Sequence, residues 1–225
     1  MHIFITGGTG YIGSALIPLL VAHHRVSALV RPASAHKLAG GCRIVCGDAL
    51  MAASYASALA GVDTLVHLVG VSHPSPAKAK SFRSVDLASV REALNAARQA
   101  GVAHFVYLSV AQPAPVMGAY LAARAEGESL IRTSGINATV LRPWYVIGPA
   151  HHWPLLLLPA YALLERLPAT REAAQRLGLV SLGQMVAALR WAVEQPPEGV
   201  RIWGVAEIRE AAAHPGYGVN TGVDG

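Results

Sequence analysis

Short apolar runs and longer amphipathic segments alternate along most of the chain. The apolar runs have the length of strands that are buried on both faces of a sheet, and they lie at 2–6, 26–30, 43–46, 64–69, 104–109 and 138–142. The segments between them carry apolar residues at helical spacing, and they lie at 12–23, 53–60, 85–100 and 120–133. Alternation of this kind predicts an α/β fold, namely a doubly wound parallel sheet with helices on both faces.

The alternation is interrupted at 150–178, where an apolar stretch gives way to a charged one. We expect this segment to form a lid over a substrate, a helical pair packed on the core, or a dimer surface, and these interpretations are not exclusive. We therefore predict one domain over 1–205, which includes this small C-terminal substrate or lid region, and a C-terminal tail over 206–225. The remaining predicted elements are a short strand and an amphipathic helix within 178–195, a strand at Val200–Val205 and a short helix at Glu207–Ala213.

The composition suits one such domain with a large core. The chain has 225 residues, of which 53% are hydrophobic and 14% are charged. Its formal net charge is +5, but it has no basic run with interleaved aromatic residues, so nucleic acid is not an expected partner. The longest apolar stretch, Trp153–Leu164, contains two prolines and is shorter than the ~20 apolar residues that span a bilayer, so we expect no membrane span.

The two cysteines, Cys42 and Cys46, stand four positions apart in the segment CRIVC, which contains the third predicted strand. Positions four apart on a strand are separated by ~13 Å, which is too far for a disulfide. We expect both to be small buried residues. This cysteine usage favours a cytoplasmic location, and so does an N-terminus in which Met1 and His2 lead straight into a strand rather than a signal sequence.

The first thirteen residues, MHIFITGGTGYIG, hold the most specific chemical signal. They predict a strand, a turn with Gly7, Gly10 and Gly13, and the start of a helix, which is the context that a dinucleotide-binding loop requires. In such a loop the first glycine permits a tight turn, the second lets the backbone approach a pyrophosphate, and the third lets the helix pack closely on the strand. The N-terminus of the helix then offers N–H groups to the phosphates. The alternative is a glycine-rich turn without a ligand.

The segment TGGTGYIG resembles the GxxGxxG fingerprint of the extended and atypical short-chain dehydrogenase/reductases, which have the Rossmann fold. The similarity extends over residues 1–205, and in style the chain is similar to the NAD-dependent epimerase/dehydratase-like and complex I accessory-subunit-like members. The other segments that carry the resemblance are LVRPAS (29–34), CGDAL (46–50), HFVYLSV (104–110), Tyr120–Glu128 and INATVLRPWYVIGP (136–149).

The resemblance also implies which residues contact a nicotinamide cofactor. Asp48 matches a position that contacts the adenine, with a loop carboxylate that caps the next helix as an equal alternative. Gly70 lies in the loop after the fourth strand, where the lack of a side chain allows a close approach. The implied contacts are Thr6, Gly7, Gly10, Tyr11, Ile12 and Gly13 in the first loop, Arg31 and Ser34 after the second strand, Asp48 and Ala49 after the third, Leu68, Val69 and Gly70 after the fourth, and Pro143, Trp144 and Val146 after the sixth.

Arg31 decides which nicotinamide cofactor we expect. It stands at the tip of the second strand, where an NAD-preferring site carries an acidic residue that accepts hydrogen bonds from the ribose hydroxyls. The chain has no acidic residue between Val26 and Arg43. A guanidinium binds a 2′-phosphate through two of its N–H groups and gains nothing from a bare ribose. We therefore predict NADP(H) in preference to NAD(H), with a solvent-exposed arginine that binds no ligand as the alternative.

Tyr120 and Arg124 occupy the place of the family's Tyr-x-x-x-Lys motif and share one face of a predicted helix. In the family the lysine binds the nicotinamide ribose, and the tyrosine exchanges a proton with the substrate oxygen while hydride moves to or from the cofactor. Arg124 keeps the charge of the lysine but not its compact shape, and it cannot take part in a proton relay. Ser109 is the candidate for the family's carbonyl-orienting hydroxyl, with a cap at the strand end as the alternative. Glu128 follows Arg124 by four residues, so an ion pair between them is a structural alternative.

Three functions fit these residues. The first is an NADP(H)-dependent oxidoreductase that acts on a small apolar carbonyl or quinone-like substrate. The second is a non-catalytic NADP(H)-binding redox sensor or assembly factor, which the arginine in place of lysine favours. The third is a nucleotide-sugar epimerase or dehydratase, which is less favoured because 150–178 lacks the polar groups that a sugar nucleotide needs.

From the sequence we expect no bound metal and either a monomer or a homodimer. His151 and His152 have no third ligand at a useful spacing, so we assign no metal. The resemblance implies a monomer or a homodimer, the latter through the helices at 85–100 and 120–133. An apolar helix face looks the same in sequence whether it is buried within one chain or between two.

Overall fold

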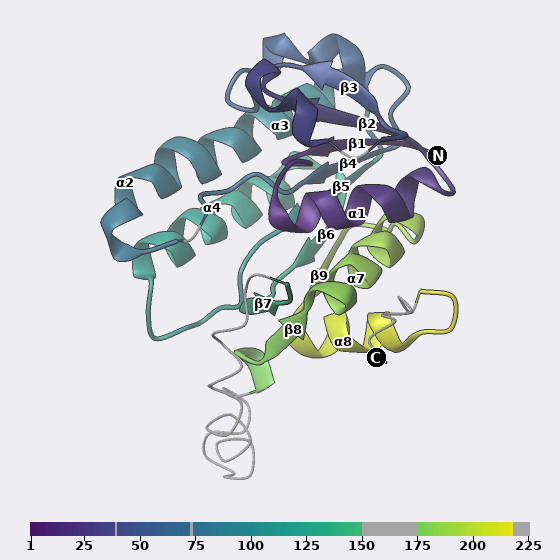
Figure 1. The fold of residues 1–225 in the computed structure, drawn as a ribbon. Helices are drawn as coiled ribbons and strands as arrows, with labels where there is room; N and C mark the ends of the chain where they lie inside the picture. Colours follow the sequence, from purple (N-terminus) through teal and green to yellow (C-terminus); the bar gives the residue numbers. More distant parts are fainter. Residues whose placement is uncertain (39, 73, 150–174, 218–225) are drawn as a thin grey trace.

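In the computed structural model, which describes residues 1–38, 40–72, 74–149 and 175–217, the chain forms the α/β fold that the sequence predicts (Figure 1). Seven of the described strands form one parallel sheet in the order β3-β2-β1-β4-β5-β6-β9. Each predicted strand of 1–142 belongs to this sheet, and the strand expected near residue 200 is added at its edge. The strands are β1 (His2–Thr6), β2 (Arg25–Val30), β3 (Arg43–Cys46), β4 (Thr64–His67), β5 (His104–Leu108), β6 (Asn137–Leu141) and β9 (Val200–Trp203).

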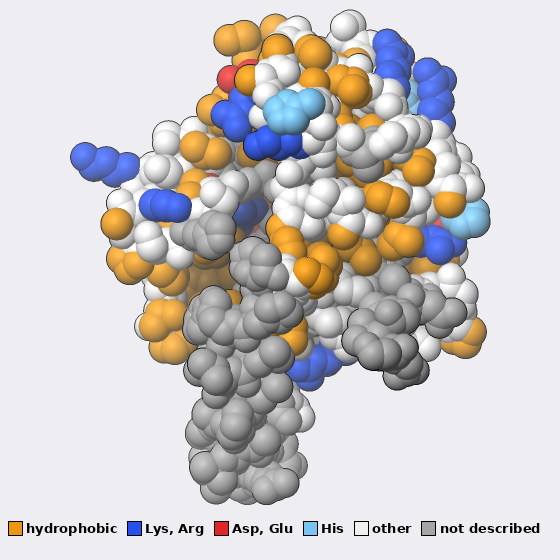
Figure 2. All heavy atoms as spheres, in the orientation of Figure 1, with side chains coloured by type: hydrophobic (Ala, Val, Ile, Leu, Met, Phe, Trp, Pro, Cys, Tyr) orange, Lys and Arg blue, Asp and Glu red, His pale blue; other side chains and the backbone are white. Residues whose placement is uncertain are grey.

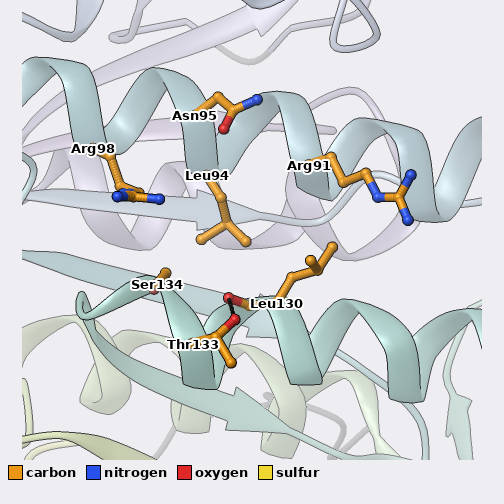
Figure 3. Close-up of a pocket in the computed structure, with 7 residues that line it drawn as sticks. All are labelled: Arg91, Leu94, Asn95, Arg98, Leu130, Thr133 and Ser134. Atoms are coloured by element: carbon orange, nitrogen blue, oxygen red, sulfur yellow. Dashed lines mark hydrogen bonds between the residues drawn. The ribbon is translucent and has the colours of Figure 1, made fainter.

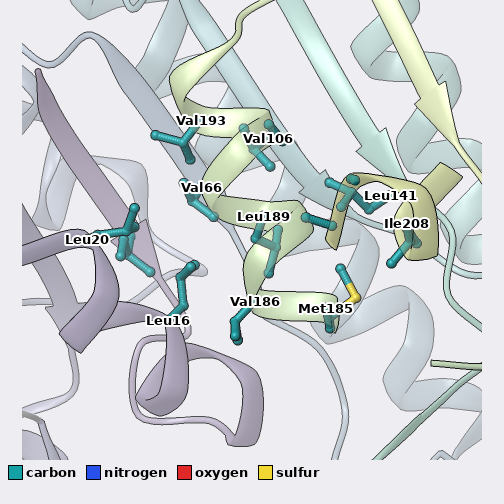
Figure 4. Close-up of a cluster of buried hydrophobic side chains, with 14 of the residues drawn as sticks. Leu16, Leu20, Val66, Val106, Leu141, Met185, Val186, Leu189, Val193 and Ile208 are labelled. Carbon is teal, nitrogen blue, oxygen red and sulfur yellow. The ribbon is translucent and has the colours of Figure 1, made fainter. Parts of the chain in front are cut away.

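Helices cover both faces of the sheet, as a doubly wound fold requires (Figure 1). Successive side chains of a strand point to opposite faces, so Ile3 and Ile5 of β1 belong to one core and Phe4 belongs to the other. Figure 4 shows the first core, where side chains of α1 and α7 meet over the strands. The first core is covered by α1 (Tyr11–Val21), α7 (Leu182–Glu194) and α8 (Val205–Ala213), and the second by α3 (Ala88–Ala100) and α4 (Gly118–Ser134).

The helix that we predict over 53–60 is wrong, because this stretch forms two short 3₁₀ turns, Ala52–Ser54 and Ala56–Leu59. Tyr55 separates them with a non-helical backbone at φ −142° and ψ −2°. Its buried ring stacks on Phe4 of β1, with the ring centroids 5.9 Å apart. The tertiary contact of one aromatic side chain thus overrides the helical spacing of its neighbours.

The predicted burial of both cysteines is also wrong. Cys46 is exposed and Cys42 is only partly buried. β3 is the edge strand of the sheet, and three of its four residues are exposed. The apolar run at 43–46 has the pattern of a central strand. An edge strand, however, has a neighbouring strand on one side only, and most side chains of β3 are exposed to solvent.

The folded unit extends further toward the C-terminus than the predicted boundary at residue 205. The short helix expected there is α8, and Val205, Ile208 and Ala211 bury its inner face in the first core. His214 then stacks on Trp191 of α7 at 5.4 Å. The first part of 206–225 is therefore a packed helix rather than a tail, because its apolar residues recur at helical spacing and reach the core.

A second, two-stranded parallel sheet links the loop after β6 to the start of α7. It pairs β7 (Tyr145–Ile147) with β8 (Leu179–Ser181). Ser181 also caps α7, because its hydroxyl accepts a hydrogen bond from the Gln184 N–H at 3.0 Å. The lid predicted for 150–178 lies, up to residue 174, outside the described residues. Among the described helices, none is long and apolar enough to cross a membrane.

Candidate functional site

The loop between β1 and α1 has the geometry that its glycines predict. Gly7 has a φ of +79°, and a Cβ placed on it would lie 2.8 Å from the carbonyl carbon of Leu68. A Cβ on Gly13 would lie 2.5 Å from the carbonyl oxygen of Gly7. Both positions therefore require glycine. Gly10 is the N-cap of α1 and has no capping side chain, so the N–H groups of the first turn can bind an anionic ligand.

A pocket of about 320 Å³ lies over this loop, at the carboxyl ends of β1, β2, β3 and β4. This is the edge where open parallel sheets bind their ligands, and its size is within the ~300–1,000 Å³ of small-molecule sites. The predicted contact residues that line it are Gly7, Gly10, Arg31, Ser34, Asp48, Ala49, Leu68, Val69 and Gly70. The residues that sequence reasoning missed are Thr9, Leu29, Val30, Gly47, Leu50 and Val85.

The missed residues differ in the signal they offered. Thr9 lies within the glycine motif itself, and Leu29, Val30, Gly47 and Leu50 are close in sequence to predicted contacts. Their position near the pocket could therefore be predicted from the sequence. Val85 comes from a segment more than ten residues beyond β4, and nothing in the sequence placed it at the strand ends.

The remaining predicted cofactor contacts do not line this pocket. Thr6 is buried, and its hydroxyl lies 2.9 Å from Nδ1 of His67. The carbonyl oxygen of Pro143 accepts a hydrogen bond from the Ala111 N–H at 2.9 Å, which ties the loops after β5 and β6 together. Ile12 and Val146 pack on the first core, and the ring of Trp144 contacts that of Tyr145 at 5.5 Å. The other residues of this group are Tyr11, Ile12 and Gly13 in the first turn of α1, Trp144, and Val146 of β7.

Two charged side chains, Arg31 and Asp48, line the pocket beside the ends of β2 and β3. Arg31 is exposed at the end of β2, and no carboxylate within the described residues pairs with it. In Figure 2 basic side chains and a histidine gather over the part of the molecule where Figure 1 shows the turn after β2. Asp48 lines the pocket, and its carboxylate also accepts a hydrogen bond from the Leu50 N–H at 2.9 Å. This bond closes a local turn and does not cap the next helix, whose N-cap is Met51 and has no side-chain cap.

Tyr120 and Arg124 stack together on the inner side of α4. The guanidinium carbon of Arg124 lies 5.3 Å from the centroid of the Tyr120 ring, and this ring also contacts the ring of Phe82 at 5.1 Å. Arg124 is only 4% exposed and forms an ion pair with the buried Asp86 at 2.7 Å. It also donates a hydrogen bond to the carbonyl oxygen of Leu108 at 2.8 Å. The cation of this motif is thus enclosed by protein groups.

The charges of this buried pair depend on each other. Burial raises the pKa of Asp86, and the neighbouring Arg124 acts in the opposite direction. Burial by itself lowers the pKa of Arg124, but Tyr120, Tyr107 and Asp86 raise it by more, so its pKa lies above the ordinary value. Arg124 therefore remains a cation in the interior of the protein.

The predicted alternative of an ion pair between Arg124 and Glu128 is wrong. Glu128 is fully buried and binds Arg142 through two hydrogen bonds of 2.9 and 2.5 Å. Ser109 donates a hydrogen bond to the same carboxylate at 2.6 Å, so its hydroxyl is held by Glu128. Burial raises the pKa of Glu128, but the hydrogen bonds from Arg142 and Ser109 outweigh it and leave the pKa below its usual value. Four positions separate Glu128 from Arg124, yet Glu128 binds Arg142, which directly follows β6, and Arg132 of its own helix.

Replacing Glu128 by alanine is expected to lower the free energy of unfolding by about 3 kcal/mol, because it leaves the Arg142 guanidinium without its buried partner. Chemical denaturation at pH 7 measures the loss. Glu126→Ala is the matched control, since Glu126 lies on the same helix as Glu128 and its pairs with the exposed Arg83 and Arg91 contribute less than about 1 kcal/mol. Equal losses in the two variants would contradict the structural role of Glu128.

A second pocket, of about 270 Å³, lies between α3 and α4 and away from the strand ends (Figure 3). Leu94 and Leu130 face each other across it in Figure 3, and the hydroxyl of Thr133 donates a hydrogen bond to the carbonyl oxygen of Leu130 at 3.2 Å. No residue of the predicted site lines it. The full lining consists of Arg91, Leu94, Asn95, Arg98, Leu130, Thr133 and Ser134.

Three features together define a dinucleotide-binding α/β protein. They are glycines at which no side chain fits, the N-terminus of a helix, and a pocket at the ends of parallel strands. The chain belongs to the NAD(P)H-binding family, whose model matches residues 7–150. Its fold and family are those that the resemblance to the short-chain dehydrogenase/reductases implied, and its cofactor is a nicotinamide dinucleotide. Within the described residues, no group of three His, Cys, Asp or Glu side chains is placed to hold a metal ion.

Two reductases are among the curated relatives. A ceramide reductase of Caulobacter vibrioides is 27% identical over 191 residues, which cover 82% of this chain and 58% of that protein. A 4-hydroxy-2-methyl-3-oxo-4-farnesyl-3,4-dihydroquinoline-1-oxide ketoreductase of Stigmatella aurantiaca is 28% identical over 171 residues, which cover 66% of this chain and 51% of that protein. The chain thus spans little more than half the length of these relatives.

Solved structures share the fold at low sequence identity. A UDP-glucuronic acid 4-epimerase of Bacillus cereus in complex with NAD superposes with a TM-score of 0.66 at 17% identity, over 91% of this chain and 77% of that one. The oxidoreductase ylbE of Lactococcus lactis also has a TM-score of 0.66, at 18% identity, over 95% of this chain and 97% of that one. Identities this low show a common fold and do not identify a substrate.

Proposed function

We propose that the protein is an NADP(H)-dependent oxidoreductase that acts on a small apolar carbonyl or quinone-like substrate. The observation that carries this proposal is the pocket at the strand ends, with the glycine loop beneath it and the exposed Arg31 at one end. Family membership and the two reductases among its relatives support oxidoreductase chemistry. The apolar segment Trp153–Leu164 supports an apolar substrate, and it lies outside the described residues.

The described residues fit the dinucleotide. A pyrophosphate needs backbone without side chains and a helix N-terminus, and Gly7, Gly10 and the start of α1 provide both. Arg31 and Ser34 line the same pocket on the side of β2, where their guanidinium and hydroxyl groups suit a 2′-phosphate. The bound cofactor supplies the hydride, and Tyr120 donates or accepts the proton at the substrate oxygen. The Arg124 guanidinium stacks on the Tyr120 ring and stabilises the position of the tyrosine.

Arg31→Asp is expected to weaken NADPH binding more than tenfold and to leave NADH binding nearly unchanged, because it replaces the group that binds the 2′-phosphate with a repelling charge. A fluorescence titration with each cofactor measures both affinities. Lys37→Asp makes the same charge reversal at an exposed residue of the same turn that does not line the pocket, so it controls for net charge. If Arg31→Asp weakens both cofactors equally, the NADP(H) preference is wrong.

A non-catalytic NADP(H)-binding protein, such as a redox sensor or assembly factor, is the second candidate. Two observations favour it. The charge of Arg124 is paired with Asp86, and the hydroxyl of Ser109 donates its hydrogen to Glu128. The wild-type protein would then bind NADPH in the same titration and show no turnover with carbonyl or quinone acceptors. Turnover with any such acceptor excludes this candidate.

A further inference from the structure

Two pairs of side chains, each with a spacing of four residues, face each other between α4 and the segment before α3. Tyr120 and Arg124 lie on α4, and Phe82 and Asp86 lie on a π-helical turn, Phe82–Leu87. Phe82 contacts the ring of Tyr120, and Asp86 pairs with Arg124. Short π-helical turns are frequent at functional sites because they shift the side chains that follow by one register. Here the turn supplies a partner to each member of the Tyr120–Arg124 motif.

The Asp86–Arg124 pair also supports the loop after β4, which forms one wall of the pocket. A Cβ on Gly70 would collide with Nη2 of Arg124, so the guanidinium lies directly against the loop backbone. The other oxygen of Asp86, Oδ2, accepts a hydrogen bond from the Val71 N–H at 3.1 Å. Both partners of the ion pair therefore hold Gly70–Val71 from the protein interior.

A buried hydrogen-bond chain connects the same pair to the glycine loop. Ser89 donates its hydroxyl hydrogen to the backbone oxygen of Asp86, so Ser89 accepts from Nε2 of His67 at 3.2 Å. His67 consequently carries its proton on Nε2, and its Nδ1 accepts from the hydroxyl of Thr6, which directly precedes Gly7. These hydrogen bonds from Thr6 to Asp86 connect the ends of β1 and β4, two neighbouring strands whose following loops line the pocket.

The position of Arg124 leaves it little access to a cofactor. Its side chain is almost completely buried, and its two Nη groups face Asp86 and the carbonyl oxygen of Leu108. Nη2 lies against Gly70, which lines the pocket, whereas Arg124 itself is not among the lining residues. A guanidinium held in this way acts on the site through the groups that it touches.

We propose that Asp86 is a positioning residue of this site, and that it holds Arg124 beneath Gly70 and behind Tyr120 so that the cation orders the cofactor loop instead of binding the cofactor. The role rests on the proposed function, because the loop is the nicotinamide-cofactor loop only if the protein binds NADPH. It differs from the role of the family's lysine, and it explains how a bulky arginine is accommodated at that position.

The test is a double-mutant cycle with Asp86→Asn, Arg124→Met and the combination of the two. Asparagine keeps an oxygen for the Val71 N–H, so Asp86→Asn removes only the charge that holds Arg124. Each single variant is expected to weaken NADPH binding about tenfold, and the double variant is expected to be no weaker than the worse single variant, since both changes remove one arrangement. Glu126→Gln removes a charge from the same helix at pairs with the exposed Arg83 and Arg91, and as the matched control it is expected to bind NADPH as the wild type does.

Hydrogen exchange of the amides of Leu68–Val71, measured without cofactor, provides a second readout. Arg124→Met is expected to raise this exchange about tenfold although the acceptor of the Val71 N–H is retained. Arg124→Lys keeps a cation opposite Asp86 and is expected to have a smaller effect, and it replaces Arg124→Met if that variant fails to fold.

The outcomes separate the two proposals. Effects on NADPH binding that multiply in the double variant, or a loop whose exchange is unchanged in Arg124→Met and Arg124→Lys, would overturn the role of Asp86. A wild-type protein that does not bind NADPH would overturn the proposed function, and the exchange measurement would then still decide whether the pair orders the loop.

Discussion

Lowering the pH from 7 to 4 is expected to remove about 6 kcal/mol of stability, about 3 kcal/mol for each of two buried histidines. Burial, with a contribution from Arg124, lowers the pKa of His67 to about 3, and burial with Arg201 nearby lowers the pKa of His104 to about 4. Both imidazoles are neutral in the folded protein at pH 7. The unfolded chain binds these two protons from about pH 6.5 downward, so the folded state loses stability from that pH until the folded-state pKa values are reached.

The surroundings of the two histidines explain why they resist protonation. Nδ1 of His67 accepts a hydrogen bond from Thr6, so a second proton on the ring would break that bond. His104 lies between Thr64 at 3.4 Å and Thr139 at 3.1 Å, and Arg201 donates to the hydroxyl of Thr139. A loss of this size is comparable to the total stability of most domains, so we expect the protein to unfold near pH 4.

Urea denaturation at several pH values between 7 and 4 measures this dependence. His67→Gln and His104→Gln keep a donor and an acceptor but do not titrate, so each is expected to remove about half of the pH dependence. His23→Gln is the control, because its side chain is exposed. A wild-type free energy of unfolding that is the same at pH 4.5 and pH 7 would refute the assignment of two buried neutral histidines.

Tyr120→Phe is expected to lower kcat by a factor on the order of 10²–10⁴ and to leave the dissociation constant of NADPH within about twofold of the wild type. The substitution removes only the hydroxyl that we propose exchanges the proton. The phenylalanine ring keeps the contacts with Phe82 and with the Arg124 guanidinium, so the local packing is retained. Steady-state kinetics with carbonyl and quinone acceptors, together with an NADPH titration, measure the two quantities.

Tyr55→Phe is the matched control for the loss of a hydroxyl. Its hydroxyl is buried in the second core and has no hydrogen-bond partner among the described residues, so its removal is expected to leave turnover unchanged. A Tyr120→Phe variant that turns over acceptors at the wild-type rate would remove Tyr120 from the chemistry. A parallel loss of NADPH affinity would show instead that the hydroxyl serves cofactor binding.

The parts of the site that the sequence predicts are those set by consecutive residues. Gly7, Gly10 and Gly13 follow a strand and open a helix, so their spacing alone describes a phosphate-binding turn. Arg31 follows the second strand directly, and parallel strands end at the same edge of the sheet, so its place near the glycine loop followed from strand counting. These inferences require no knowledge of which side chains meet.

The partners of the charged residues were not predictable in the same way. Arg124 and Glu128 are one helical turn apart, which favours a local pair, but they do not pair with each other. Arg124 binds Asp86, and Glu128 binds Arg142 in addition to Arg132 of its own helix. Asp86 comes from the π-helical turn, and Arg142 follows β6. The choice depends on the strand order and on how α4 is rotated against the sheet, and neither quantity is encoded in a spacing of four residues.

By itself, the sequence determined the alternation of strands and helices, the class of fold and the position of the dinucleotide-binding loop, because hydrophobic periodicity and glycine spacing are local properties of the chain. Only the tertiary structure decided that Tyr55 interrupts a helix, that β3 is an exposed edge, and that Asp86 pairs with Arg124. Each of these outcomes depends on a contact between residues that are distant in sequence. Such contacts form when the whole chain buries its apolar surface, because an aromatic ring is then placed in a core and a buried charge requires a partner of opposite charge.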